Sequence, residues 1–160
     1  MIRVIQHLFL DSKTLHDIIE VKRLSWNYSL EDHLNWIEKN IREDDYHFLL
    51  IEDDKLVAYI NLVNVVVSKG DNLIPFLGIG NVCSREKGLG YGKSIMLELN
   101  NYMIANELRG ILFCQASLVR FYSKYGWSII NNLHPVPSVC TMVFNCNMES
   151  VNLEKINRIF

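Results

Sequence analysis

A glycine-rich turn between a strand and a long helix constrains this chain more than any other feature of its sequence. Residues 73–83 form an apolar stretch that predicts a strand, and the turn after it carries three glycines at alternate positions. Helical spacing predicts a helix over residues 90–108, and a second strand is expected at residues 111–114. Because a helix joins the two strands, they should be parallel and connected by a right-handed crossover. Ligands of such sheets favour the carboxyl ends of the parallel strands.

The rest of the chain predicts more strands and helices around this unit. The inward face of the long helix is predicted to be Ile95, Leu99, Tyr102, Met103 and Asn106. Further strands are expected at residues 2–8, 46–51, 56–67, 127–130 and 139–146, and further helices after a cap at Asp11 or Ser12, after a capping box of Ser29 and Asp32, and near Leu118. The tail from Glu149 indicates no element. This order predicts an α/β fold of α+β character, with a mixed sheet covered by helices on both faces.

Composition favours one compact domain over residues 1–160, because 49% of the 160 residues are apolar. The formal net charge of −2 gives no basic surface for nucleic acid. The first ten residues are too polar for a signal peptide, and no apolar run approaches the ~20 residues of a membrane span. We therefore expect a cytoplasmic protein with no nucleic-acid or membrane partner.

The four cysteines lie in apolar stretches and form no C-x-x-C pair of the kind that binds zinc. They are Cys83, Cys114, Cys140 and Cys146. We expect reduced, buried thiols and no metal.

The glycine-rich turn has the properties of an anion site. Glycines leave backbone amides uncovered, and unpaired amides at a helix start, with the helix dipole, attract phosphate. Arg85, Lys87 and Lys93 add positive charge. The alternative is a turn that binds nothing. A Walker A loop would need its first glycine at position 87, which is Lys87, and the spacing of Gly88, Gly90 and Gly92 is not the G-x-G-x-x-G of a dinucleotide site.

Two motifs resemble the GNAT superfamily of acyl-CoA-dependent N-acetyltransferases. Arg85-Glu-Lys-Gly88-Leu-Gly90 matches its (Q/R)-x-x-G-x-(G/A) signature between a strand and a long helix. The segment from Cys114 to Trp127 resembles the family's F-Y-x-K-x-G-(F/W) region, and Leu118–Tyr122 is similar to arylalkylamine N-acetyltransferases. With the element order, the resemblance covers nearly all of residues 2–147.

The resemblance implies an acetyl-CoA donor and a site between two splayed parallel strands in a twisted sheet. An amide near Val82 would polarise the thioester carbonyl, and Tyr122 would protonate the leaving thiolate, although helical spacing alone would place Tyr122 in the core. Gln115 stands where many relatives have Asn. The cofactor-binding residues that it implies are Asn81, Val82, Cys83, Arg85, Lys87, Gly88, Leu89, Gly90, Tyr91, Gly92, Lys93 and Gln115.

Many members of the family carry a glutamate on the fourth strand as the general base. This chain departs from that pattern, because residues 74–82 contain no acid. His47, Glu52 and His134 are candidates, and proton loss to water is an equal alternative. The acceptor is expected to be the primary amine of a small molecule, an amino sugar or a peptide N-terminus. Five aromatic residues either line its pocket or belong to the core: Trp26, Tyr28, Trp36, Tyr46 and Tyr59. A non-catalytic acyl-CoA-binding or interaction module is the alternative function, and a homodimer is among the assemblies that the sequence allows.

Overall fold

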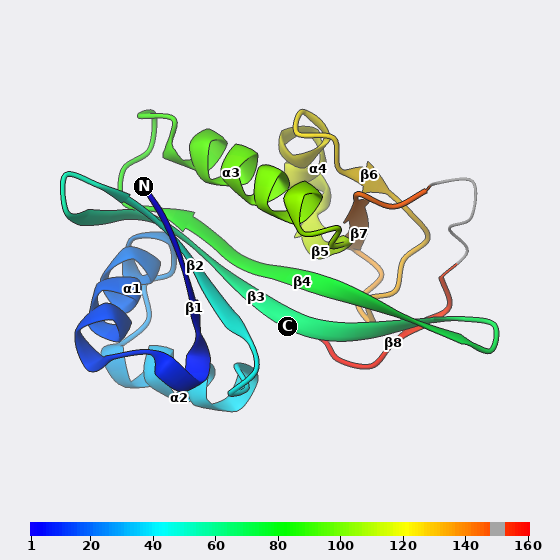
Figure 1. Cartoon of the computed structure of the whole chain (residues 1–160), viewed down its shortest axis with the longest axis horizontal. Coiled ribbons are helices and arrows are strands. Elements are labelled where there is room, and N and C mark those ends of the chain that lie inside the picture. Colours follow the sequence, from blue (N-terminus) through cyan, green and yellow to red (C-terminus); the bar gives the residue numbers. More distant parts are fainter. Residues whose placement is uncertain (148–152) are drawn as a thin grey trace. The chain divides into compact units, whose positions relative to one another are not determined.

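The computed structural model describes residues 1–147 and 153–160 and has a mixed α/β fold, as predicted (Figure 1). In chain order the elements are β1 (Ile2–Gln6), the 3₁₀ turn η1 (His7–Phe9), α1 (Ser12–Ser25), α2 (Leu30–Asn40), β2 (Tyr46–Glu52), β3 (Lys55–Lys69), β4 (Asn72–Ser84), α3 (Tyr91–Ala105), β5 (Gly110–Gln115), α4 (Ala116–Ser123), β6 (Ser128–Ile129), β7 (Val139–Phe144) and β8 (Lys155–Ile156).

The chain divides into two compact units. The first comprises residues 1–63 and 81–98, and the second comprises residues 64–80 and 99–160. Strands β3 and β4 and helix α3 each run from one unit into the other. A single domain over residues 1–160 stays a prediction.

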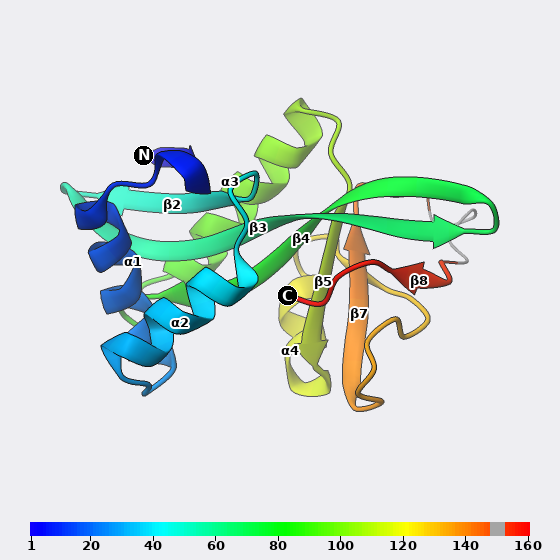
Figure 2. The ribbon, with the colours of Figure 1, turned by 90° about the horizontal axis from the view of Figure 1, so that it is seen from below.

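The first unit is built on antiparallel strands in the order β1-β2-β3. Helices α1 and α2 lie on one side of these strands, and the start of α3 lies on the other (Figures 1 and 2). Alternation along the strands places one apolar row under α1. The resulting core cluster contains Ile5, Ile18, Val21, Leu49, Leu56, Tyr59 and Cys83.

Local capping begins the helices as predicted, and local turn chemistry joins two of the strands. Asp11 begins α1 by accepting a hydrogen bond from the Thr14 amide at 2.8 Å. The expected capping box begins α2, with Ser29 and Asp32 bonding to each other's backbone amides. Between β2 and β3, Asp53 and Asp54 have φ of 47° and 58°, the left-handed conformation of a tight hairpin turn.

The second unit contains the predicted parallel pair. Leu77, Gly78 and Ile79 of β4 pair with residues 110–112 of β5, and β5 continues through antiparallel pairing to β7 and then β6. Strand β8 pairs antiparallel with β3 near its hairpin (Figure 2). The sequence showed no signal for β8, because a strand of two residues exists only through its pairing with β3.

The predicted inward face of α3 is partly wrong. Ile95, Leu99 and Met103 are fully buried, but Tyr102 is half-buried and Asn106 is exposed beyond the end of the helix. Met96 and Asn100 are buried instead. The side chain of Asn100 donates to the Tyr125 carbonyl at 2.6 Å and accepts from the Trp127 indole at 3.1 Å. These bonds explain how a polar residue is buried in the second unit.

Two further features concern Gly78 of the second unit and the cysteines of both units. A β-carbon on Gly78 would lie 2.6 Å from the Phe160 ring, so this glycine permits close approach by the C-terminal aromatic residue. All four cysteines are free, but only Cys83 and Cys114 are buried; Cys140 and Cys146 are half-buried, contrary to the prediction.

None of the helices in residues 1–147 and 153–160 is long and apolar enough to cross a membrane.

Candidate functional site

The turn after β4 has a backbone that requires its glycines. Gly88 and Gly90 have φ of +89° and +81°, a region that other residues avoid. A β-carbon on either glycine would meet no atom within 4 Å, so backbone conformation and not crowding selects glycine. Residues 86–90 are exposed, and α3 begins directly after them at Tyr91. Gly92 lies in the first helical turn, where amides have no partner within the helix.

The three basic residues of the turn have different surroundings. Lys87 and Lys93 are exposed. Arg85 is half-buried; its Nε donates to the Leu56 carbonyl at 3.1 Å and its amide donates to the Val57 carbonyl at 2.8 Å. Arg85 therefore fastens the turn to β3, while the two lysines present their charge to solvent.

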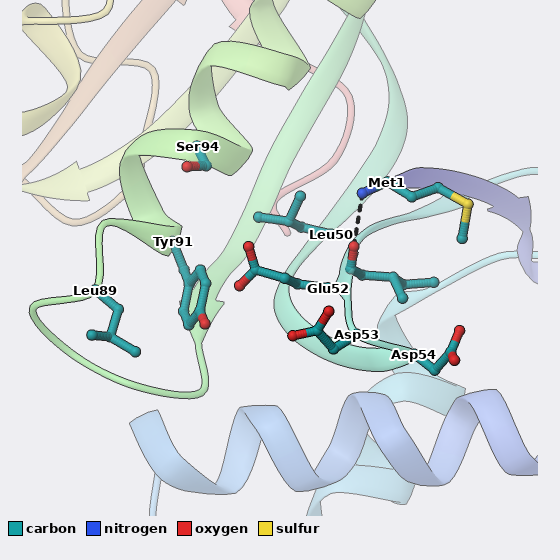
Figure 3. A pocket seen from close by; sticks show the side chains of 9 residues that line it. Met1, Leu50, Glu52, Asp53, Asp54, Leu89, Tyr91 and Ser94 are labelled. Carbon is teal, nitrogen blue, oxygen red and sulfur yellow. Dashed lines mark hydrogen bonds between the residues drawn. The ribbon is translucent and has the colours of Figure 1, made fainter.

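A cavity of about 650 Å³ lies beside the turn, within the first unit (Figure 3). Its lining residues are Met1, Leu50, Ile51, Glu52, Asp53, Asp54, Leu89, Tyr91 and Ser94. Three of these residues are acidic, so the cavity does not suit a pyrophosphate. The Tyr91 ring lies beside Glu52 (Figure 3), and this carboxylate raises the Tyr91 pKa. Among the described residues, no group of three or more His, Cys, Asp or Glu side chains is placed to hold a metal ion.

Strand β4 carries an irregularity just before the turn. Asn81 has φ of +50°, which costs backbone energy in a residue other than glycine. Its side-chain amide donates to Oδ1 of Asn61, whose own buried Nδ2 has no partner among the described residues. Val82 is half-buried and Cys83 is buried. Strained backbone of this kind is typical of ligand sites.

A second cavity in the first unit, of about 540 Å³, is bounded by α1, α2 and Asn81. We call it the α1–α2 cavity. Its lining residues are Lys22, Trp26, Tyr28, Asp32, His33, Trp36 and Asn81. Three of the five aromatic residues considered for an acceptor pocket line it. Tyr59 is fully buried in the core instead, and Tyr46 is half-buried in β2, outside this lining.

Lys22 of the α1–α2 cavity was missed by the sequence analysis. It is only 2% exposed, and its Nζ lies 4.1 Å from the centroid of the Trp36 ring. Burial lowers the Lys22 pKa to about 8. Burial also raises the pKa of the neighbouring Cys83 thiol to about 12, so this thiol is neutral at physiological pH and supplies no counter-charge. A lysine in a helix ordinarily indicates an exposed face, so no sequence signal distinguished it.

His33 forms another wall of the same cavity. It is 3% exposed, and its Nε2 donates to the Trp26 carbonyl at 3.2 Å, which fixes the ring. Burial lowers the His33 pKa. His33 is therefore neutral at physiological pH and holds the chain between α1 and α2 in place.

Tyr122 and Gln115 belong to the second unit, on and before α4. Tyr122 is 8% exposed and packs edge-on against Phe121 and Trp127, with centroid separations of 5.1 and 6.5 Å. Burial, with a smaller effect of Cys114, raises the Tyr122 pKa to about 12. No hydrogen bond of the Tyr122 hydroxyl is found among the described residues. Gln115 is exposed at the helix N-cap, and its side chain makes no capping bond.

The three candidate bases differ in their surroundings. His47 is fully buried, with hydrogen bonds of 2.9 Å to both His7 and the Tyr59 hydroxyl, and burial lowers its pKa to about 3. It is too weak a base to deprotonate an amine at neutral pH. Glu52 lies in the acidic cavity beside Tyr91. His134 accepts from the Val136 amide at 3.1 Å, in a local loop contact.

Comparison with known proteins gives a consistent family result. Residues 9–130 match the model of the Acetyltransferase (GNAT) domain family. None of the proteins with curated annotation matches the chain in sequence. Two similar solved structures are ElaA of Escherichia coli, at 19% identity and TM-score 0.64 over 89% of this chain and 97% of that one, and an acyl-CoA N-acyltransferase of Pseudomonas aeruginosa, at 17% identity and TM-score 0.66 over 89% and 98%.

A third similar structure is the PaiA N-acetyltransferase of Thermoplasma acidophilum, solved in complex with coenzyme A. It is 19% identical, with a TM-score of 0.57 over 89% of this chain and 98% of that chain. At these identities the three likenesses show the fold and nothing finer.

Proposed function

The chain belongs to the GNAT acetyltransferase family, and from this premise we propose that it transfers an acetyl or other acyl group from acyl-CoA to a primary amine. The acceptor is the amine of a small molecule, an amino sugar or a peptide N-terminus. The turn between β4 and α3 carries this proposal, because Gly88 and Gly90 have positive φ there and leave open space around the helix start. That arrangement suits a pyrophosphate, which accepts hydrogen bonds from uncovered amides.

The proposed cofactor site extends along the chain on both sides of the glycines. Exposed Lys87 and Lys93 supply charge, and Arg85 holds the turn on β3. The backbone of residues 81–83 would pair with the pantetheine amides, and the strained conformation of Asn81 supports a ligand role for this segment. Leu89, Tyr91 and Gly92 belong to the same stretch, and Gln115 in the second unit is the remaining proposed contact.

Acyl-CoA supplies a thioester whose carbonyl carbon is open to attack by a neutral amine. In the transfer, a new nitrogen–carbon bond replaces the carbon–sulfur bond, the nitrogen loses a proton and the departing sulfur gains one. The Val82 amide is proposed to donate to the carbonyl oxygen as it gains negative charge. Tyr122 is proposed to hold the proton for the sulfur; its pKa of about 12 keeps this phenol protonated at neutral pH.

Water is the proposed proton acceptor from the amine. His47 is buried and has a pKa of about 3, and β4 has no acid between residues 74 and 82. The missing acid also motivates the alternative of a non-catalytic acyl-CoA-binding module. Thiol release from acetyl-CoA across a panel of amines separates the two functions, because only the enzyme turns over.

Substitution of the two exposed lysines tests the cofactor proposal more directly than substitution of the glycines. Gly90→Val would strain the backbone at φ of +81° whatever it binds, so its effect on affinity would be ambiguous. The Lys87→Gln/Lys93→Gln double variant removes two exposed charges without such strain. CoA affinity measured by calorimetry should fall about tenfold at low salt.

The matched control for this test is Lys155→Gln, an exposed lysine on β8. It should leave CoA affinity unchanged. Equal affinity of the double variant and the control for CoA would remove the turn from the proposed site.

A further inference from the structure

We infer that the α1–α2 cavity binds an acceptor amine that also carries a carboxylate, namely an amino acid with an apolar side chain, and that Lys22 pairs with the carboxylate. The inference rests on the proposed function, since it takes the cavity as the acceptor site. It assigns the substrate class and the residue that recognises it.

The first observation is the position of Lys22. It is 2% exposed, lines the cavity and lies over the Trp36 ring. Lys13 of the same helix shows the ordinary alternative, with a side chain that is 85% exposed and pairs with Asp17 at 3.0 Å. Burial of a lysine costs free energy unless its charge is neutralised or paired. The position of Lys22 therefore calls for a counter-charge.

No salt bridge to Lys22 is formed by the described groups around it. Asp32 is the acidic residue of the cavity lining and keeps its charge, but its Oδ2 accepts from the Ser29 hydroxyl at 2.6 Å and from the Ser29 amide at 3.3 Å and makes no ion pair with Lys22. The Cys83 thiol is neutral because burial raises its pKa to about 12. Within the described part of the chain, the recorded salt bridges do not include Lys22. An anion from outside would complete the site.

The second observation is the aromatic wall. Trp26, Tyr28 and Trp36 line the cavity, and its volume of about 540 Å³ lies in the range of small-molecule pockets. Flat aromatic faces bind an apolar ring or a branched aliphatic group. An amino acid with such a side chain therefore presents an apolar group to the wall and a carboxylate to Lys22.

The third observation relates the cavity to the proposed chemistry. Asn81 lines the cavity and stands in the strained segment directly before Val82, whose amide is proposed to polarise the thioester. Both belong to the first unit. An acceptor held by Lys22 therefore lies in a cavity bordered by the strand segment to which acyl transfer is assigned.

The test compares three probes of the same shape on the wild-type protein. Phenylalanine carries the carboxylate, phenylalaninamide replaces it with a neutral amide, and phenethylamine lacks it. Thiol release from acetyl-CoA should give a KM for phenylalanine at least about tenfold lower than for the other two, because a charge-assisted pair is lost in them. Lys22→Met should remove this preference, while Lys13→Met, from the exposed face of α1, should retain it.

A binding measurement makes the test independent of turnover. Calorimetry should detect 3-phenylpropionate, a carboxylate without an amine, on the wild-type protein, and Lys22→Met should weaken its binding about tenfold. Met is close to Lys in volume and apolar, so the variant should fold, and circular dichroism checks this.

The outcomes separate the inference from the proposed function. Amine turnover with equal KM for phenylalanine and its amide would refute the inference and leave the function intact. Absence of turnover with every amine would contradict the function, and the binding arm would then decide the inference alone. Phenylpropionate binding that is absent, or equal in the wild type and Lys22→Met, would overturn it.

Discussion

Lys22→Met should raise the free energy of unfolding, although it removes the charge that is proposed to bind the acceptor carboxylate. The folded protein buries this ammonium, with 2% exposure, and holds its pKa at about 8 instead of 10.5. A lowered pKa means that the folded state binds the Lys22 proton more weakly than the unfolded chain does. Folding at neutral pH therefore carries a penalty that Met does not have.

The magnitude follows from the two pKa values. Below pH 8 the lysine is charged in both states and the penalty is complete, at about 3 kcal/mol for pH 7. Between pH 8 and 10.5 the folded state loses its proton first, so wild-type stability rises, and the penalty falls to about 1 kcal/mol at pH 10. The contact with the Trp36 ring offsets part of it, so the net gain of Lys22→Met at pH 7 should be about 1–3 kcal/mol.

The measurement is urea unfolding of the wild type, Lys22→Met and Lys13→Met from pH 7 to pH 10. The advantage of Lys22→Met over the wild type should shrink across this range. Lys13→Met should stay within about 0.5 kcal/mol of the wild type throughout, since its side chain is exposed. A constant difference between Lys22→Met and the wild type at all pH values would refute the burial of a charged lysine at this position.

Further predictions concern Tyr122 and two glycines of the second unit. Tyr122→Phe should lower the rate of single-turnover acyl transfer by ~10²–10⁴-fold with unchanged CoA affinity. Equal rates for Tyr122→Phe and the wild type would mean that Tyr122 has a packing role only. Because burial raises the Tyr122 pKa to about 12, the wild-type rate should show no loss from its ionisation between pH 7 and pH 10; a falling limb there that Tyr122→Phe lacks would contradict this. Gly110→Ala should destabilise the fold by about 1–3 kcal/mol in thermal unfolding, because its β-carbon would lie 2.6 Å from buried Trp127. Gly78→Ala, which meets the C-terminal Phe160 ring, should cost less, and equal losses would contradict the packing argument.

Much of the fold was predictable because its signals are local. Ser29 and Asp32 cap a helix through bonds three residues apart, and Asp53 and Asp54 turn a hairpin through their own backbone angles. These interactions involve residues that are close in the sequence, so the element order and most boundaries could be predicted from it. The parallel pairing of β4 with β5 followed from the helix between them.

Two of the misses in the fold concern α3. The predicted inward face omitted Asn100, yet Tyr125 and Trp127, 25 and 27 residues away, satisfy its side chain in the core. Asn106 was placed in the core by helical spacing, but the helix ends at Ala105. Partners from distant segments therefore decide whether a polar group can be buried, whereas this helix end is formed locally, with Glu107 at φ of 55° and the Leu108 amide bonded to the Met103 carbonyl.

The same division applies to the candidate site. The sequence by itself determined the glycine turn, because positive φ at Gly88 and Gly90 and uncovered amides are properties of a few consecutive residues. Only the tertiary structure decided that Lys22 is buried against Trp36 and faces the α1–α2 cavity. A lysine in a helix can be solvated or buried. The outcome depends on which surface of the helix is covered by another helix, and the local sequence does not specify that packing.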